Sequence, residues 1–290
     1  MANAEGRDYS AFQPPVTAEM LKGLSFAYTR VSDWGGPDGT TMGTDPTFAH
    51  DWEAIKAAKL HRGAYWFLLP SVDAVAQARY FVDAVKKVGL AAGDMLVCDS
   101  EVLAANVDSV THAFCKEVVA LAGPHCPVLV YSNHNVGQHL TSCTSFPLWF
   151  AWPSSTAPPA SLISPWKHWT FWQWGEVDNV DADVFDGTPA HLDRWIAGYL
   201  PKPVPPPPQP VPPMEDNEMI MIRPAENQVP AGTPWPGIFL LFCDGTLSHV
   251  QPSAGHPEVS NVSAYQSAGI KGPVTITWAE FETLSKKPAT

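Results

Sequence analysis

Short apolar runs alternate with longer amphipathic stretches over residues 1–200 of the chain. Each apolar run has the length and the β-branched and aromatic content of a buried strand. Eight runs fit this description, at residues 6–10, 24–31, 62–69, 94–101, 127–133, 147–152, 170–175 and about 180–185. We therefore expect eight strands in this part of the chain.

Three stretches between these strands carry apolar residues at helical spacing, at residues 45–60, 71–89 and 107–123. The strands that follow have no long helices between them. Alternating strands and helices predict a mostly parallel sheet. The pattern therefore favours an α/β fold, an eight-stranded TIM-like barrel with reduced helices in its second half. An open doubly wound sheet is the alternative, which the lack of a glycine-rich turn after the first strand weakens.

A proline-rich segment, PKPVPPPPQPVPP, divides the chain at residues 201–213. Such a segment favours the polyproline II conformation and would span roughly 40 Å as a semi-rigid spacer. An SH3 ligand is the less favoured interpretation. The sequence thus predicts a first domain at residues 1–200, a linker at 201–213 and a small second module at 214–290.

The sequence of the second module predicts an α+β fold. We expect strands at residues 219–223, around 238–250 with a hairpin turn at Asp244-Gly245, and at 274–277, together with helices at 259–269 and 278–287. Thr277 and Glu280 form a plausible capping box for the last helix. A module of this size holds only a modest core, so it is expected to be an accessory unit rather than a catalyst.

The net charge of −12, from 17 basic and 29 acidic residues, changes which partners are plausible. It argues against nucleic-acid binding and against simple electrostatic adhesion to an anionic membrane. Five cysteines without a C-x-x-C pair argue against a zinc ribbon or a thioredoxin motif. We expect reduced thiols in a protein made in a cytoplasm.

The segment MANAEGRDYS lacks the basic and apolar regions of a signal peptide, and no apolar run approaches the length of a membrane span. We therefore expect no membrane insertion. A protein of this kind would need another route to any site of action outside the cell.

Two carboxylates stand in the apolar run MLVCDSEVL, at residues 95–103. Asp99 and Glu101 are two residues apart, so both side chains point to one side of the strand, while Cys98 and Ser100 point to the other. They lie at the carboxyl end of their strand, where parallel barrels carry their active sites. A salt-bridged pair, or a strand end that reaches solvent, is the plainer interpretation.

Two further acids occupy corresponding positions. Asp8 lies at the end of the first strand, and Asp181 near the end of the last. The first and last strands of a closed barrel are neighbours, so both could face Asp99 and Glu101 across one opening. Repulsion and partial burial would raise at least one pKa, giving a protonated acid beside an ionised carboxylate, as glycosidic cleavage requires. A turn or capping role is the alternative for Asp8 or Asp181 alone.

The twelve tryptophans support a sugar ligand, because aromatic faces stack on the apolar faces of sugar rings. Those placed near strand ends are Trp66, Trp149, Trp152, Trp169, Trp172 and Trp174. For any single one, an ordinary core position is the alternative. There is no G-x-S-x-G, Walker A or H-E-x-x-H motif. A divalent metal bound by the acidic cluster stays open as a minor alternative, but we expect neither a metal nor a cofactor.

These fragments together resemble family-25 glycoside hydrolases, the phage and bacterial muramidases, over about residues 6–195. The opening DYSAFQ is similar to D-x-S-x-x-Q, LVCDSEV to the D-x-E strand, and FWQW followed by NVDADVFDG to F-W-Q-Y…VD-x-N-x-F-x-G. The other matching fragments are FAYTRVSDWG (26–35), DPTFAHDWEAIKAAKLHRGAYWF (45–67), VLVYSN (128–133) and PLWFAW (147–152).

The resemblance implies a barrel that cleaves the β-1,4 bond between N-acetylmuramic acid and N-acetylglucosamine with retention. Glu101 would be the general acid, and Asp99 would stabilise developing charge directly or by orienting the substrate's acetamido group. Asp8 and Asp181 would tune this pair and contact the sugar. The residues expected to line the substrate cleft are Tyr65, Tyr131, Trp149, Gln173 and Arg30.

Two features depart from the family pattern. Trp66 stands where the family often has histidine, and residues 34–43 form a glycine-rich stretch expected to be an irregular loop. Neither feature removes one of the four expected catalytic carboxylates, so we still expect catalysis.

A catalytic domain, a spacer and a small module resemble the layout of a phage endolysin, made in the host cytoplasm and acting on the cell wall after release. The module at 214–290 would then bind a cell-wall polymer. The alternatives are a virion-associated structural protein and a barrel that binds glycan with weak or no activity.

Overall fold

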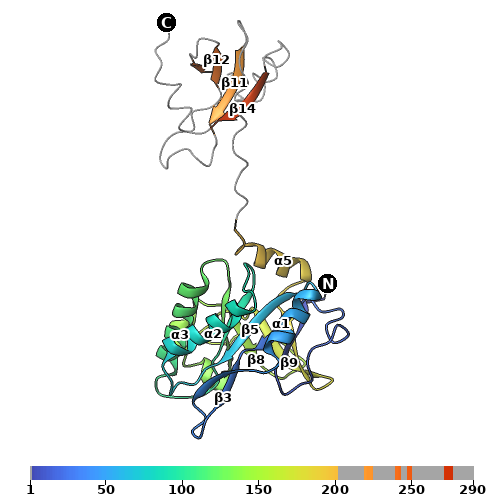
Figure 1. Ribbon diagram of the computed structural model, residues 1–290, viewed down its shortest axis with the longest axis vertical. Coiled ribbons are helices and arrows are strands. Elements are labelled where there is room, and N and C mark those ends of the chain that lie inside the picture. Colours follow the sequence, from blue (N-terminus) through green and yellow to red (C-terminus); the bar gives the residue numbers. More distant parts are fainter. Residues whose placement is uncertain (1, 202–218, 225–238, 243–246, 250–270, 277–290) are drawn as a thin grey trace. The chain divides into compact units, whose positions relative to one another are not determined.

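The computed structural model describes residues 2–201 and four further segments, 219–224, 239–242, 247–249 and 271–276 (Figure 1). The chain divides into two compact units, Met1–Lys202 and Pro203–Thr290.

The first unit is built on a closed barrel, which excludes the open doubly wound sheet. The strands follow one another around the barrel in the order β1-β10-β9-β8-β7-β6-β5-β2. The bounds are β1 Glu5–Tyr9, β2 Phe26–Arg30, β5 His61–Phe67, β6 Met95–Asp99, β7 Val128–Asn133, β8 Leu148–Ala151, β9 Phe171–Val177 and β10 Val180–Phe185. The predicted eight-stranded barrel is confirmed.

The last strand runs against both of its neighbours. All other adjacent pairs in the barrel are parallel, whereas β10 is antiparallel to β9 and to β1. The reversal takes place in a two-residue loop in which Asp178 and Asn179 have φ of 56° and 61°, the backbone of a tight hairpin turn. Asp181 consequently lies near the start of its strand, not near its end as expected from the sequence.

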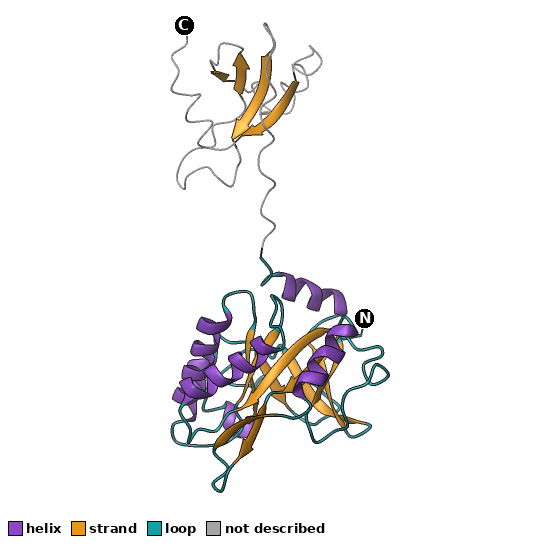
Figure 2. Ribbon diagram, viewed as in Figure 1, coloured by secondary structure: helices purple, strands orange, loops and turns teal. Residues whose placement is uncertain are grey.

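Three helices on the outside of the barrel confirm the predicted amphipathic stretches, α1 Phe48–Ala57, α2 Ala74–Lys87 and α3 Val107–Ala122 (Figure 2). Their apolar faces and the outward side chains of the strands form one buried layer that includes Trp52, Trp66 and Phe114. The shorter elements α4 His134–Gly137, α5 Pro189–Ala197 and a 3₁₀ turn at Thr141–Cys143 were not predicted. No helix within the described residues is both long enough and apolar enough to cross a bilayer.

Residues 34–43 are not an irregular loop. They form most of a hairpin of β3 Ser32–Gly35 and β4 Thr41–Thr44, in which Trp34 pairs with Met42. Gly36 and Gly39 have positive φ in its turn, so the glycines that suggested irregularity allow the chain to reverse. The Trp34 indole N–H donates to the carbonyl of Phe67 at 2.9 Å, which fixes the hairpin to the end of β5.

Aromatic rings fill the interior of the barrel. Tyr28 stacks on Trp149 with ring centroids 4.3 Å apart and meets Phe171 edge to face. Gly63 leaves the space for this packing, because a Cβ at that position would overlap the Tyr28 ring. α5 covers the end of the barrel where the parallel strands begin, with Leu192 and Ile196 buried against this interior cluster.

The described part of the second unit is a four-stranded sheet of β11 Met219–Pro224, β12 Phe239–Phe242, β13 Leu247–His249 and β14 Lys271–Ile276, in the order β13-β12-β11-β14. These strands agree with the predicted ones. The predicted hairpin turn, the helices at 259–269 and 278–287, the capping box and most of the linker lie outside the described residues.

The close approach of Gly63 to Tyr28 predicts a measurable cost for a single methyl group. We expect Gly63→Ala to lower the free energy of unfolding by about 1–3 kcal/mol, because the added Cβ forces the Tyr28 ring out of place. Gly175→Ala is the matched control, since its added Cβ meets no atom within 4 Å. Denaturant unfolding of both variants checks this, and equal stabilities would contradict it.

Candidate active site

A cleft of about 640 Å³ opens at the carboxyl ends of the parallel strands. The structure brings all nine residues singled out from the sequence to its lining: Asp8, Arg30, Tyr65, Asp99, Glu101, Tyr131, Trp149, Gln173 and Asp181. They come from all eight strands of the barrel or the residue positions just beyond them. The cleft therefore forms only when all eight strands have come together in the closed barrel.

Strand register explains why these side chains meet. Asp99, Tyr131 and Trp149 occupy neighbouring positions across β6, β7 and β8. On the other side of the opening Asp8 pairs directly with Asp181. Because β10 runs antiparallel, the start of this strand lies beside the end of β1, so Asp181 reaches the same opening.

The alternation predicted for the end of β6 holds in the structure. Asp99 and Glu101 both line the cleft, whereas Cys98 is buried in the layer beneath the helices. The Ser100 hydroxyl also points outward, where it hydrogen-bonds the Thr111 hydroxyl of α3 at 2.8 Å. The outward residues anchor the strand end to the helix layer and hold the two carboxyls at the cleft.

A chain of hydrogen bonds orders one wall of the cleft. The Tyr131 hydroxyl donates to Gln173 Oε1 at 2.9 Å, and Gln173 Nε2 donates to Asp8 Oδ2 at 2.9 Å. Asp8 is 6% exposed, so its carboxyl depends on these donors for solvation. Asp8 Oδ2 is therefore held by Gln173, and Asp8 Oδ1 is left for other contacts.

The opposite wall is held by Arg30, the one cation among the described residues that line the cleft. Its Nε and Nη2 both donate to the buried carboxylate of Asp45, at 2.9 and 2.8 Å. Asp45 Oδ2 also accepts from the backbone N–H of Ala11 at 3.0 Å, which fixes the loop after β1. Above this pair the exposed ring of Phe12 lies 4.6 Å from the Arg30 guanidinium carbon.

Burial and mutual repulsion shape the titration of the acids. The pKa of Asp8 is raised from 3.8 to about 7 by burial and by the nearby charge of Asp181. Burial, then Glu101 and Asp8, raises the pKa of Asp99 well above its usual range, while Arg30 opposes the shift. The pKa of Glu101 is raised by burial and by Asp181, and burial and Glu176 raise that of Asp181. At neutral pH the cluster therefore holds protons that isolated carboxylates would release.

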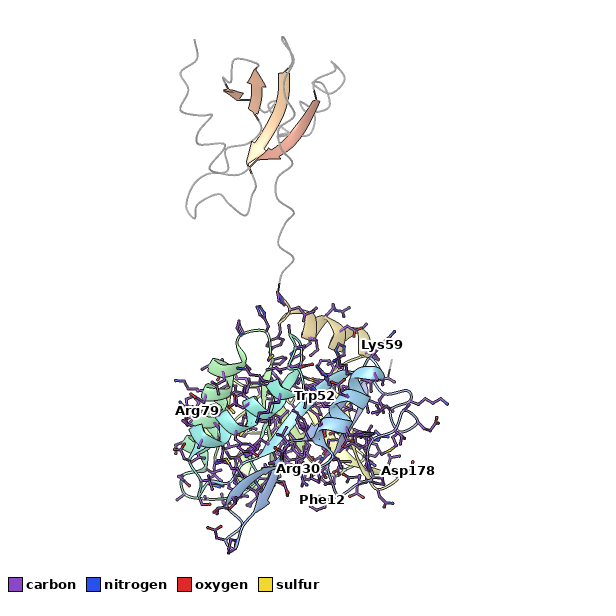
Figure 3. The ribbon with its side chains drawn as sticks, in the orientation of Figure 1. Phe12, Arg30, Trp52, Lys59, Arg79 and Asp178 are labelled. Atoms are coloured by element: carbon purple, nitrogen blue, oxygen red, sulfur yellow. The ribbon has the colours of Figure 1, made fainter. Side chains whose placement is uncertain are left out.

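Sequence reasoning missed three contributors. Asp183, fully buried below the cleft, accepts a hydrogen bond from the Trp149 indole at 2.8 Å. The sequence could have indicated Asp183, because it stands two residues after Asp181 and residues at this spacing lie on the same face of a strand. Phe12 and Trp34 also line the cleft, but their loop and hairpin carry no strand periodicity that could have placed them. Figure 3 shows Phe12 and Arg30 at the end of the barrel opposite Lys59.

The expectation that strand-end tryptophans face a sugar is wrong for most of them. Of the six, only Trp149 lines the cleft. Trp66 is fully buried in the outer layer, where its indole N–H donates to Gln77 Oε1 at 3.1 Å. Tyr65 faces the cleft, and its neighbour Trp66 must face outward because side chains alternate along a strand. The departure from the family pattern at Trp66 therefore does not alter the cleft surface.

Comparisons with known proteins agree with this architecture. A family model described as glycosyl hydrolases family 25 matches residues 8–183. Uncharacterized protein YegX of Escherichia coli strain K12 is 28% identical over 193 residues, which cover 62% of this chain and 66% of that protein. The chain thus spans slightly less than two thirds of that relative's length.

Solved structures share the fold. The bacterial lysozyme from Streptomyces coelicolor aligns with a TM-score of 0.55 at 22% identity, over 69% of this chain and 99% of that one. A muramidase from Acremonium alcalophilum aligns with a TM-score of 0.55 at 20% identity, over 67% and 99%. A family 25 glycosyl hydrolase from Bacillus anthracis aligns with a TM-score of 0.51 at 20% identity, over 66% and 92%.

The raised pKa values predict that stability falls as pH rises toward neutral. Between 3.8 and about 7, folded Asp8 retains a proton that the unfolded chain has released, so the free energy of unfolding decreases as pH increases. We expect a thermal midpoint several degrees lower at about pH 8 than at about pH 5, measured by circular dichroism at constant ionic strength.

The variant Asp8→Asn supplies the control, because it removes this titration and should show a weaker pH dependence. A midpoint that rises between these pH values, or a pH dependence identical in the variant, would contradict the assignment.

Proposed function

Because the chain belongs to glycosyl hydrolase family 25, we propose that it is a muramidase that hydrolyses the β-1,4 bond between N-acetylmuramic acid and N-acetylglucosamine in peptidoglycan. The observation that carries this proposal is the group of four carboxyls from β1, β6 and β10, Asp8, Asp99, Glu101 and Asp181, in one cleft. Glycoside hydrolysis needs a protonated acid beside an ionised carboxylate, and this cluster holds both forms near neutral pH.

Glu101 is the general acid in this proposal. It is half-buried at the cleft surface, where a leaving-group oxygen can reach it, and the neighbouring charge of Asp181 favours its protonated form. Asp99 lies deeper, at 5% exposure. Arg30 opposes the rise in the Asp99 pKa that burial and the neighbouring acids cause. In the proposed catalytic state the proton is on Glu101, and the negative charge is on Asp99, below the developing positive charge of the sugar.

Asp99 acts by stabilising that charge, either directly or by orienting the acetamido group of the substrate for attack. Both routes retain the anomeric configuration. Asp8 and Asp181 tune the pair and contact the sugar, while Tyr65, Tyr131, Trp149 and Gln173 shape the wall. This division of roles follows the resemblance of LVCDSEV to the D-x-E strand of the family.

We further propose that the protein serves as a phage endolysin, made in the host cytoplasm and acting on the wall after release. The arrangement of the barrel, the proline-rich segment and a separate second unit supports this role. The second unit would bind a cell-wall polymer, and its surplus of acidic over basic residues favours aromatic and hydrogen-bonding contacts over charge. A virion-associated structural role and a weakly active glycan-binding barrel are the competing functions.

The first test is release of new reducing ends from purified peptidoglycan. Glu101→Gln should lower the rate by about 10²–10⁴-fold, because the amide cannot donate a proton to the leaving oxygen. Glu53→Gln on the exposed face of α1 is the matched control and should keep full activity. Release of N-acetylmuramic reducing ends identifies the bond that is cut.

Folded wild-type protein that releases no reducing ends from several wall types would overturn the muramidase proposal. Binding to the wall without release would favour the glycan-binding barrel, and co-purification with virus particles would favour the virion role.

Phe12 offers a separate test of how the cleft holds a glycan. Its ring is 84% exposed and lies over Arg30 at the cleft rim, so a sugar ring that covers it removes apolar surface from water. We expect Phe12→Ala to raise KM for soluble peptidoglycan fragments by about 2- to 10-fold with little change in kcat. Leu103→Ala, an exposed apolar residue outside the cleft lining, is the control, and equal effects of both would contradict this role.

A further inference from the structure

Asp183 is a completely buried carboxyl that the proposed mechanism does not use. It lies on β10 with no solvent exposure. Its Oδ1 accepts from the Trp149 indole at 2.8 Å, and its Oδ2 receives no N–H or hydroxyl donor from the described residues. A buried carboxylate with one donor is costly, whereas a protonated carboxyl at the same place needs only an acceptor for its own hydrogen.

That acceptor is the carboxyl of Asp8. Asp183 lies two residues beyond Asp181, the cross-strand partner of Asp8, on the same face of β10, so the carboxyls of Asp183 and Asp8 are neighbours. Two ionised carboxylates cannot form a hydrogen bond with each other, because neither has a hydrogen to donate. Asp8 already accepts from Gln173 Nε2 at 2.9 Å, and its carboxyl also reaches the cleft. Asp183 has only the Trp149 indole. The proton shared by the pair therefore belongs on Asp183, and the negative charge on Asp8.

We propose that Asp183 is a positioning residue whose neutral carboxyl donates a hydrogen bond to Asp8, which favours the ionised form of Asp8 and orients its carboxyl at the cleft. Trp149 takes part through its indole, which fixes the other oxygen of Asp183. The chain Trp149–Asp183–Asp8–Gln173–Tyr131 then crosses the floor of the cleft as one continuous set of hydrogen bonds.

The surrounding groups agree with this charge distribution. Burial, followed by the charge of Asp8, raises the pKa of Asp183 well above its usual range. Burial and the charge of Asp181 raise the pKa of Asp8, neighbouring donors that include Gln173 and Asp183 lower it, and the net pKa is about 7. The titratable groups around the pair are Tyr28 on β2, Tyr65 on β5, Asp99 on β6 and Tyr131 on β7, together with Tyr9 on β1 and Asp181 on β10.

The experiment is a pH titration of the full chain carrying ¹³C-labelled aspartate carboxyls, followed by NMR. The Asp8 and Asp183 signals are assigned from Asp8→Asn and Asp183→Asn. We expect Asp183 to remain protonated well above the pH at which exposed aspartates ionise, and Asp8 to titrate with a midpoint near 7. An Asp183 signal that titrates like an ordinary aspartate, near pH 4, would overturn the proposal.

Two variants separate hydrogen-bond donation from simple filling of space. Asp183→Asn keeps both a donor for Asp8 and an acceptor for Trp149, so the Asp8 midpoint should stay near its wild-type value. Asp183→Leu removes the donor and should raise that midpoint by about one pH unit. An unchanged midpoint in Asp183→Leu, or an equal rise in both variants, would overturn the proposal. If Asp183→Leu does not fold, the wild-type titration decides alone.

The catalytic meaning of this pair rests on the proposed muramidase function, but the titration requires no substrate. In a kinetic comparison, a role through Asp8 predicts that the acid limb of kcat/KM moves to higher pH in Asp183→Leu and is restored in Asp183→Asn. A uniform loss at every pH would show a merely structural role. Failure of the muramidase assay leaves the titration result standing, so the two proposals fail independently.

Discussion

The pairing of β1 with β10 is the constraint on which the cleft depends. This pairing closes the barrel. It also places Asp8 opposite Asp181, although the two residues lie near opposite ends of the sequence of the first unit. A closed barrel has no free strand edge, so every register is restrained by neighbours on both sides. A slip of one residue would turn Asp8 out of the cleft and bring a neighbouring residue in. The antiparallel course of β10 is equally necessary, because it delivers the start of that strand to the opening.

Holding several acids together beneath one opening opposes stability, and the rest of the barrel compensates. Burial raises the pKa of Asp8, Asp99 and Asp183, which means that ionising them costs free energy in the folded protein. The aromatic packing of Tyr28 and Trp149 below the cleft and the apolar layer beneath the helices supply the favourable burial. Such a conflict between local cost and global stability is expected at functional sites.

Periodicity was sufficient for most of the fold and for part of the site. Alternation along β6 predicts which side Asp99 and Glu101 share, and the same rule, applied to Tyr65 and Trp66, separates the cleft residue from the core residue. The direction of β10 depends on the backbone of a two-residue loop, which apolar pattern does not encode. Loop and hairpin residues such as Phe12 and Trp34 could not be placed, because their positions are decided by contacts between distant segments, among them the bonds to Asp45 and to the carbonyl of Phe67.

The acids of the cleft are best understood as two pairs, and each pair is asymmetric. Asp99 has the cation Arg30 nearby, whereas Glu101 has the anion Asp181. Asp8 accepts from Gln173 and reaches the cleft, whereas Asp183 accepts from Trp149 and is completely buried. In the Asp8–Asp183 pair the better-solvated member favours the charged form and its partner favours the proton. In the proposed mechanism Asp99 and Glu101 also divide these two roles, which lets one site provide a carboxylate and an acid at the same pH. Because each pair then carries about one charge instead of two, the cleft is less negative than its number of carboxyls implies. Under the proposed function, a glycan that carries carboxylates of its own would meet correspondingly less repulsion as it enters.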